Sequence, residues 1–336
     1  MSVLGAIQAN RETAIRIAQR VGTTNTRGML KDAETQLVER LRAMPPTGTF
    51  TEIRMRATLA QIRDVLRGLV LPGMRDLAID GAEQAASVAA TGTVDYLNAA
   101  ERQYKGIGTQ ALALDESSIM DAATSGARAS VLRRLASSGT PAEGADAEPH
   151  KARIGILQRY GMNVVGHFEN ILRTNLLTRS SFEDTRKQIV DASPFLQGAP
   201  ASWSERIVRT ETMGAYGRAT FEATQEAHEQ LGDLVKILCA TFDNRTGSDS
   251  IACHGEIRRP NEPFETWFGL MQHPPNRPND REIVVTHRQS WPIPPTLAWR
   301  PDGEIHARWK LEKRKGAAPP RPLMTTVDLG SFGRTR

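Results

Sequence analysis

The chain has 336 residues, of which 39% are hydrophobic and 5% aromatic, and its formal net charge is +5. This length supplies material for two compact domains. No apolar run reaches the roughly 18 residues that a membrane span needs, so we expect a soluble protein that is made in a cytoplasm and has no membrane contact.

The first third of the chain predicts amphipathic helices. Apolar residues recur at three- and four-residue steps over 30–44, and Pro45-Pro46 ends that pattern. A heptad-like run follows over 55–69, with Thr51 as its predicted start and Pro72-Gly73 as its predicted stop. Both stripes indicate the core of a helix bundle, with partner binding by the same faces as the alternative.

The middle of the chain predicts further helices around a linker. Residues 74–136 form an alanine-rich pattern interrupted by glycines, and the loop-type composition of 137–150 predicts a linker. A long helix is expected over 154–172, and a short one capped by Ser180 or Ser181 ends near Val190.

Beyond residue 200 a helix gives way to short strands. Ser202 is the predicted cap of a helix over 203–230. Segments 235–242 and 282–286 have the β-branched and apolar character of strands, and a loop-rich stretch separates them. We therefore predict a mainly α protein whose C-terminal part is an α+β module with a small sheet.

Four regions follow from these patterns. They are an N-terminal helical region at 1–136, a linker at 137–150, an α+β module at 151–298 and an extended basic arm at 299–336.

Three polar clusters stand in order after residue 200. Arg209-Thr210-Glu211 lies on the predicted helix, and Asp243-Asn244-Arg245-Thr246 follows the first strand, with His254-Gly255 after it. The third cluster is the His-Pro element from His273 to Arg281. Taken singly, each cluster is typical of a solvated helix face or a turn.

In this order the clusters resemble the head-morphogenesis family of tailed bacteriophages, the Mu F-like minor head proteins. The resemblance covers roughly residues 150–290, and the motifs lie between Trp203 and Arg281. It implies a structural protein of the virion, without enzymatic activity, at the portal vertex or the capsid interior, present in the host cytoplasm during assembly. It also implies a role in head assembly, DNA packaging or DNA delivery, with the portal protein or the major capsid protein as partner.

The sequence departs from the family at the cysteine positions. Members often carry cysteine pairs after the Asp-x-Arg-Thr and His-Pro motifs, an arrangement that suits tetrahedral zinc. Here Gly247, Ser250, Asn276 and Pro278 stand at those positions. A residual site built from Cys253, His254, His273 and His287 is the alternative, but we expect no metal and no cofactor. Cys239 and Cys253 are expected to be reduced and partly buried.

Charged contacts offer a different way to hold the long loop on the helix. Arginine can bind a carboxylate through two parallel hydrogen bonds. We expect a structural network of motif residues, comprising Arg209, Thr210, Glu211, Asp243, Arg245, Thr246, His254, Gly255, His273, Pro274, Arg277, Asp280 and Arg281.

An enzyme is the rival interpretation of the same residues. Asp243, His254 and His273 are residue types that could serve a metal-dependent nuclease or a delivered effector. The sequence has no nucleophile elbow, phosphate-cradling glycine loop or His-Glu-x-x-His motif, so we expect no catalytic residues.

The C-terminal arm carries the whole net charge. Residues 299–336 contain nine Lys or Arg against four Asp or Glu. Basic residues with interleaved aromatics suit contact with packaged double-stranded DNA, and an acidic protein surface is the alternative. A plain nucleic-acid-binding protein without a capsid role also fits this pattern. The residues that we expect to bind a partner or DNA are Arg308, Lys310, Lys313, Arg314, Lys315 and Arg321.

Overall fold

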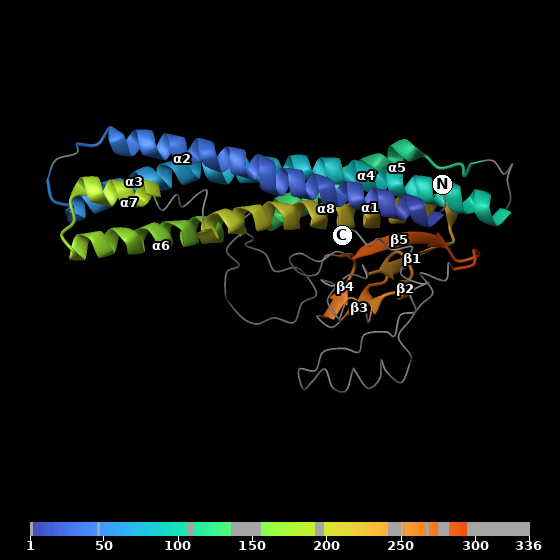
Figure 1. Ribbon diagram of the computed structural model, residues 1–336. Coiled ribbons are helices and arrows are strands. Elements are labelled where there is room, and N and C mark those ends of the chain that lie inside the picture. Colours follow the sequence, from blue (N-terminus) through green and yellow to red (C-terminus); the bar gives the residue numbers. More distant parts are fainter. Residues whose placement is uncertain are drawn as a thin grey trace, which may run out of the picture. The chain divides into compact units, whose positions relative to one another are not determined.

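The fold was taken from a computed structural model of the whole chain (Figure 1). The structure describes residues 3–45, 48–105, 111–135, 156–191, 198–240, 250, 253–266, 269–274 and 282–293. The predicted linker at 137–150 and the arm at 299–336 lie outside these ranges.

Helices dominate the described residues, and the strands are short and confined to the C-terminal part (Figure 1). This confirms the predicted mainly α class with a small sheet. No helix in the described ranges has the length and apolar character needed to cross a membrane. The helical elements are α1 (Val3–Gln19), η1 (Arg20–Asn25), α2 (Thr26–Arg42), α3 (Glu52–Val65), η2 (Leu66–Val70), α4 (Leu71–Lys105), α5 (Glu116–Leu135), α6 (Ile156–Leu177), α7 (Phe182–Asp191) and α8 (Gly198–Leu231).

The chain divides into two compact units, each discontinuous in sequence. Unit 1 comprises Met1–Ile17, Ala82–Arg128 and Met213–Arg336, and unit 2 comprises Ala18–Gly81 and Ala129–Thr212. Both units take segments from either side of the predicted linker, because distant helices pack with one another more than with their sequence neighbours. The predicted boundary at 137–150 itself stays a prediction.

Unit 2 is held by a large apolar core from α2, α3, η2, α6 and α7. The predicted stripes supply it: Leu30 and Leu41 of α2, Ile62 of α3 and Phe168 of α6 are all buried. The segment before α3 also pairs with the segment before α7. Phe50 N donates to Ser180 O at 3.0 Å, and the Phe50 and Phe182 rings stack with 6.3 Å between their centroids.

Local start and stop signals in unit 2 are partly confirmed. Thr51 caps α3 by accepting a hydrogen bond from Arg54 N, and Ser181 caps α7 by accepting one from Asp184 N at 3.0 Å. Helix α2 ends at Arg42, before Pro45.

The predicted stop at Pro72-Gly73 is wrong. The π-helical turn η2 joins α3 to α4, and Leu71 between them has helical φ and ψ angles. Pro72, the second residue of α4, directly follows this π turn, in which Leu71 N donates to Leu66 O five residues back, so the helix passes through the proline with the wider hydrogen-bond pattern of a π turn. Gly73 lies in direct contact with the Met29 side chain, so it marks a close approach of two helices.

The predicted cap at Ser202 is also wrong. Helix α8 begins at Gly198, so Ser202 lies inside it. Pro200 stands in the first turn of α8, where a residue without an N–H fits the helix.

Unit 1 packs helices closely through small residues. Alanines of α4, α5 and α8 are buried, and the glycines expected to interrupt the helices instead allow close approach. Gly92 of α4 contacts the Asn10 side chain of α1, and Gly126 of α5 contacts Glu222 of α8. Ser118 of α5 also donates to a Glu226 carboxylate oxygen at 2.6 Å.

The sheet of unit 1 is antiparallel with the order β2-β1-β5. Its central strand β1 (Leu234–Cys239) pairs with β5 (Ile283–Arg288) along its full length, and with β2 (Ile257–Arg258) at Lys236 and Ile237 in its middle. Strands β3 (Phe264–Thr266) and β4 (Gly269–Met271) form a separate hairpin. Both predicted strands are thereby confirmed within the described residues, and the stretch between them contains three strands.

Candidate functional site

A buried lysine lies at the centre of the module. Lys236 stands on β1 between partners on β2 and β5, and its side chain is fully buried. Its Nζ donates to the backbone oxygen of Gln272 at 3.0 Å and to the Gln272 Oε1 at 3.1 Å. The ammonium thereby holds the residue that immediately precedes the predicted His-Pro element.

Aromatic rings enclose the same ammonium. The Lys236 Nζ lies 5.1 Å from the ring centroid of Phe221 on α8 and 4.9 Å from that of Phe264 on β3, within cation–π range. Burial lowers the pKa of Lys236 to about 8, and the Glu262 carboxylate acts in the opposite direction. Lysine, glutamine and rings together join β1, α8, the β3–β4 hairpin and the His-Pro element.

The motif pair His254-Gly255 serves the backbone of β1. His254 is buried, and its Nδ1 accepts a hydrogen bond from Ala240 N at 3.1 Å, so a neutral ring carries its proton on Nε2. Gly255 has φ +75°, a conformation that favours glycine, and its N donates to Leu238 O at 2.8 Å. The pair therefore ties its turn to the end of the strand.

The His-Pro element lies directly against α8. A Cβ on Gly217 would overlap the backbone oxygen of Pro274, so this contact requires a residue without a side chain. The His273 ring lies 6.0 Å from the Phe221 ring, between centroids, and its Nδ1 is 3.1 Å from Pro274 O. Gly217 and Lys236 are thus the residues that position the predicted element.

The Arg-Thr-Glu motif lies on the part of α8 that belongs to unit 2. Glu211 is buried, and its Oε2 is 3.2 Å from Nε of Arg134 on α5. Burial raises the pKa of Glu211, and the Arg134 guanidinium acts in the opposite direction. Arg209 packs against Gly22 of η1. Thr210 stands between Arg209 and Glu211 on α8.

The residues that the structure describes include only part of the predicted charge network. Asp243, Arg245, Thr246, Arg277, Asp280 and Arg281 lie outside the described residues, so the network as a whole stays a prediction. The ion pair of Glu211 is with Arg134, a residue that the sequence motifs did not single out.

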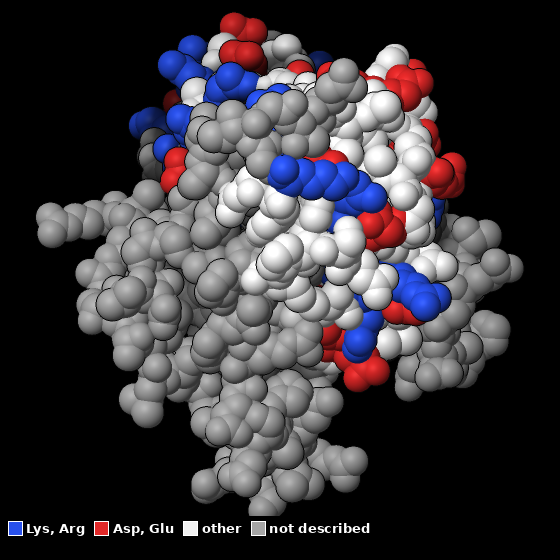
Figure 2. Space-filling view, turned by 90° about the vertical axis from the view of Figure 1, so that its right-hand side faces the viewer, with Lys and Arg blue, Asp and Glu red and all other residues white. Residues whose placement is uncertain are grey.

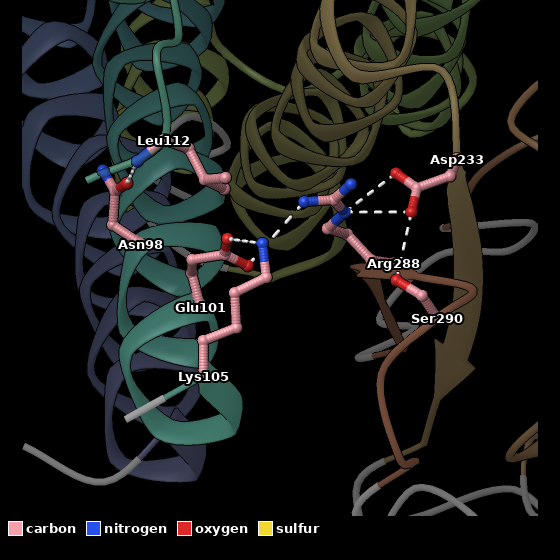
Figure 3. A network of polar contacts seen from close by, with 7 residues as sticks. All are labelled: Asn98, Glu101, Lys105, Leu112, Asp233, Arg288 and Ser290. Carbon is pink, nitrogen blue, oxygen red and sulfur yellow. Dashed lines mark hydrogen bonds and ion pairs between the residues drawn. The ribbon is translucent and has the colours of Figure 1, made fainter. Parts of the chain in front are cut away.

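A second polar network anchors β5 to α4 (Figure 3). Arg288 Nε donates to both carboxylate oxygens of Asp233, at 2.8 and 3.0 Å, and its Nη1 lies 3.7 Å from the buried Glu101 of α4. Glu101 also pairs with Lys105 at 2.5 Å, and Ser290 donates to Asp233 at 3.2 Å. The sequence motifs gave no indication of this network, because its members are spread over almost two hundred residues.

His287, which lies next to Arg288 on β5, contacts aromatic side chains. Its Nδ1 lies 2.7 Å from the Tyr96 hydroxyl, and its ring contacts those of Tyr104 and Trp291. Burial lowers the pKa of His287, which favours the neutral form of its ring.

The thiols are both free and buried, in agreement with the expected reduced state. Cys253 lies 3.6 Å from Glu265 O, and burial raises the pKa of Cys239 to about 12. Within the described ranges, no three His, Cys, Asp or Glu side chains are grouped closely enough to hold a metal ion. Ser250, at one of the family's cysteine positions, is buried.

Charge on the described surface is mixed. On the face shown in Figure 2, cations and anions are interspersed among uncharged side chains. The expected DNA-binding residues of the arm, Arg308, Lys310, Lys313, Arg314, Lys315 and Arg321, lie outside the described residues.

Comparisons with protein-family models, with curated proteins and with solved structures return no match to this chain.

Proposed function

We propose that this chain is a structural minor head protein of a tailed bacteriophage, acting at the portal vertex or in the capsid interior. One observation carries the proposal: motif residues that occur in the family's order here serve as structural ties. Gly255 closes a turn onto β1, and Pro274 abuts α8 at Gly217.

This use of the motifs favours a structural role over catalysis. His254, a candidate general base in the enzyme interpretation, is buried and accepts a backbone hydrogen bond through Nδ1. A base must reach the proton that it removes, and this ring is committed to holding its own strand. The module is therefore proposed to act by binding and positioning, without enzymatic activity.

The proposed partners divide between the folded part and the arm. The portal protein or the major capsid protein would contact the folded units. The arm, which carries the whole net charge of +5, would contact packaged double-stranded DNA through its phosphates. The protein would occupy the host cytoplasm during assembly and the virion afterwards.

The decisive experiment is quantitative mass spectrometry of purified particles. A vertex component would be present at a few to roughly a dozen copies, because it would follow the symmetry of a closed ring. Hundreds of copies would indicate a shell protein instead, and absence from particles would contradict the proposal.

The arm is tested separately with purified protein and duplex DNA. The full chain is expected to bind DNA with an affinity that falls steeply with salt, and a chain truncated after residue 298 is expected to lose most of that binding. Equal binding by both chains would contradict the role of the arm. DNA binding by the arm combined with absence from particles would favour a plain nucleic-acid-binding protein.

A further inference from the structure

The surface of unit 2 contains a groove between two packed helices. It has a volume of about 420 Å³ and is lined by residues of α3, η2, the start of α4 and α6. The lining residues of α6 run from Gln158 to Glu169, which corresponds to a length of roughly 17 Å, or about three helical turns. The volume is in the range of binding pockets.

The floor of the groove is apolar and leaves the helix backbone uncovered at one glycine. Leu66, Leu71 and Val165 supply apolar surface, and Gly161 lies against the Leu71 side chain, whereas Gly166 leaves the α6 backbone open. A Cβ on Gly166 would meet no atom within 4 Å, so the space above this glycine is empty. Grooves of this kind accept the apolar face of a third helix, because the side-chain ridges of one helix pack into the grooves of its neighbours.

Two further features single this groove out. Met162 on its edge is 56% exposed, which is unusual for a large apolar side chain and typical of adaptable binding surfaces. The π-helical turn η2 contributes Leu66 and Arg67, and π turns within helices are frequent at functional positions.

The rim of the groove is positively charged. Arg63 and Arg67 are exposed and lie four residues apart on the same side. Within the described ranges neither has an acidic partner at ion-pair distance. Glu169 on the opposite side is paired with Arg173 at 2.7 Å, so it does not neutralise them. The groove thus combines an apolar floor with a cationic edge.

We propose that this groove binds an amphipathic α-helix of a partner protein, with acidic residues flanking the apolar stripe of that helix. The apolar stripe would lie over Leu71, Val165 and Gly166, and the carboxylates would face Arg63 and Arg67. The net positive rim disfavours a second copy of the same face, because two such rims would repel. This inference does not depend on the capsid role.

The test uses two synthetic peptides of about 14 residues with the same apolar stripe. One carries glutamates beside the stripe and the other lysines, and fluorescence anisotropy measures the binding of each to the full-length protein at low salt. The wild-type chain is expected to bind the glutamate peptide at least about tenfold more tightly than the lysine peptide. Absence of saturable binding, or equal affinity for both peptides, would overturn the proposal.

Variants assign the binding to the groove. The double reversal Arg63→Glu with Arg67→Glu is expected to invert the preference between the two peptides. Gly166→Leu places its Cβ in empty space, so the fold is expected to be retained while glutamate-peptide affinity falls at least about fivefold.

A double reversal of the exposed Arg40 and Arg42 in α2 is the matched control, since it makes the same charge change outside the groove. An equal effect of this control on peptide preference would show that net charge alone decides binding, and this too would overturn the proposal. Circular dichroism of each variant verifies the helical fold.

Discussion

Replacement of the buried lysine by methionine gives a sharp prediction about stability and pH. In the wild-type protein, Lys236 has a pKa of about 8, whereas an unfolded chain binds the same proton with the ordinary value of 10.5. Between these two pH values the unfolded state holds more protons, so the free energy of unfolding rises with pH. The contribution of this group is complete above pH 10.5 and is lost as the pH falls through 8.

The magnitude follows from the two pKa values. The whole difference corresponds to about 3 kcal/mol, and the part that develops between about pH 7 and 9.5 amounts to about 2 kcal/mol. Lys236→Met removes the titrating group while keeping a similar volume. We therefore expect the wild-type protein to gain about 2 kcal/mol relative to this variant over that interval. Buried groups common to both proteins, such as Cys239, cancel in the comparison.

Urea unfolding of both proteins, followed by circular dichroism at the two pH values, measures the effect. Lys31→Met, at an exposed position of α2, is the control and is expected to leave the pH dependence unchanged. A wild-type protein that stays level with Lys236→Met, or loses stability against it as the pH rises, would refute the burial of a charged Lys236.

Three further predictions concern packing, burial and capping. Gly217→Ala is expected to lower the free energy of unfolding by about 3 kcal/mol, because the added Cβ overlaps Pro274 O. Gly166→Ala, whose Cβ meets open space, should leave the free energy of unfolding unchanged or raise it by up to about 1 kcal/mol. Similar urea midpoints for the two variants would contradict the close contact at Gly217. Burial raises the pKa of Glu211, so its carboxyl takes up a proton at a higher pH in the native state than in the unfolded state. The wild-type protein should therefore gain stability relative to Glu211→Gln as the pH falls from 7 to 5. A constant difference in stability between the two proteins would argue against burial of the charge. Ser181→Ala is expected to lower the free energy of unfolding by about 1 kcal/mol through loss of the α7 cap, and an unchanged thermal midpoint would speak against that cap.

Most helices of this protein follow from local sequence patterns. The apolar spacing over 30–44 and 154–172 depends on contacts between residues three and four apart, and α2 and α6 occupy these positions. The caps Thr51 and Ser181 are equally local, because a side chain there reaches the backbone of the same turn. The strands β1 and β5 were also recognisable from composition, over segments that overlap the predicted ones.

Proline and glycine were the main source of error. A proline predicts a helix end only where its ring and missing N–H conflict with the preceding turn. Pro72 directly follows the π turn η2, whose hydrogen bonds reach five residues back, and Pro200 stands in the first turn of α8. Gly92 and Gly126 mark close helix contacts rather than breaks. Sequence alone does not separate these cases, because the neighbour that a glycine admits lies far away in the chain.

The candidate site was likewise predictable from the sequence only in part. The motif pairs His254-Gly255 and His273-Pro274 were visible in the sequence, but Lys236 and Gly217, which hold the second pair in place, were not. A lysine inside an otherwise apolar strand was the available signal for the first, and a glycine inside a long helix for the second.

The sequence by itself therefore determined the helical class, the positions of the main elements and the order of the motifs, since each depends on neighbours within a few residues. Only the tertiary structure decided that distant segments combine into two discontinuous units, that Lys236 is enclosed by Phe221 and Phe264, and that Glu101 pairs with Arg288. These contacts join residues tens to hundreds of positions apart, where burial and close packing rather than local spacing select the partner.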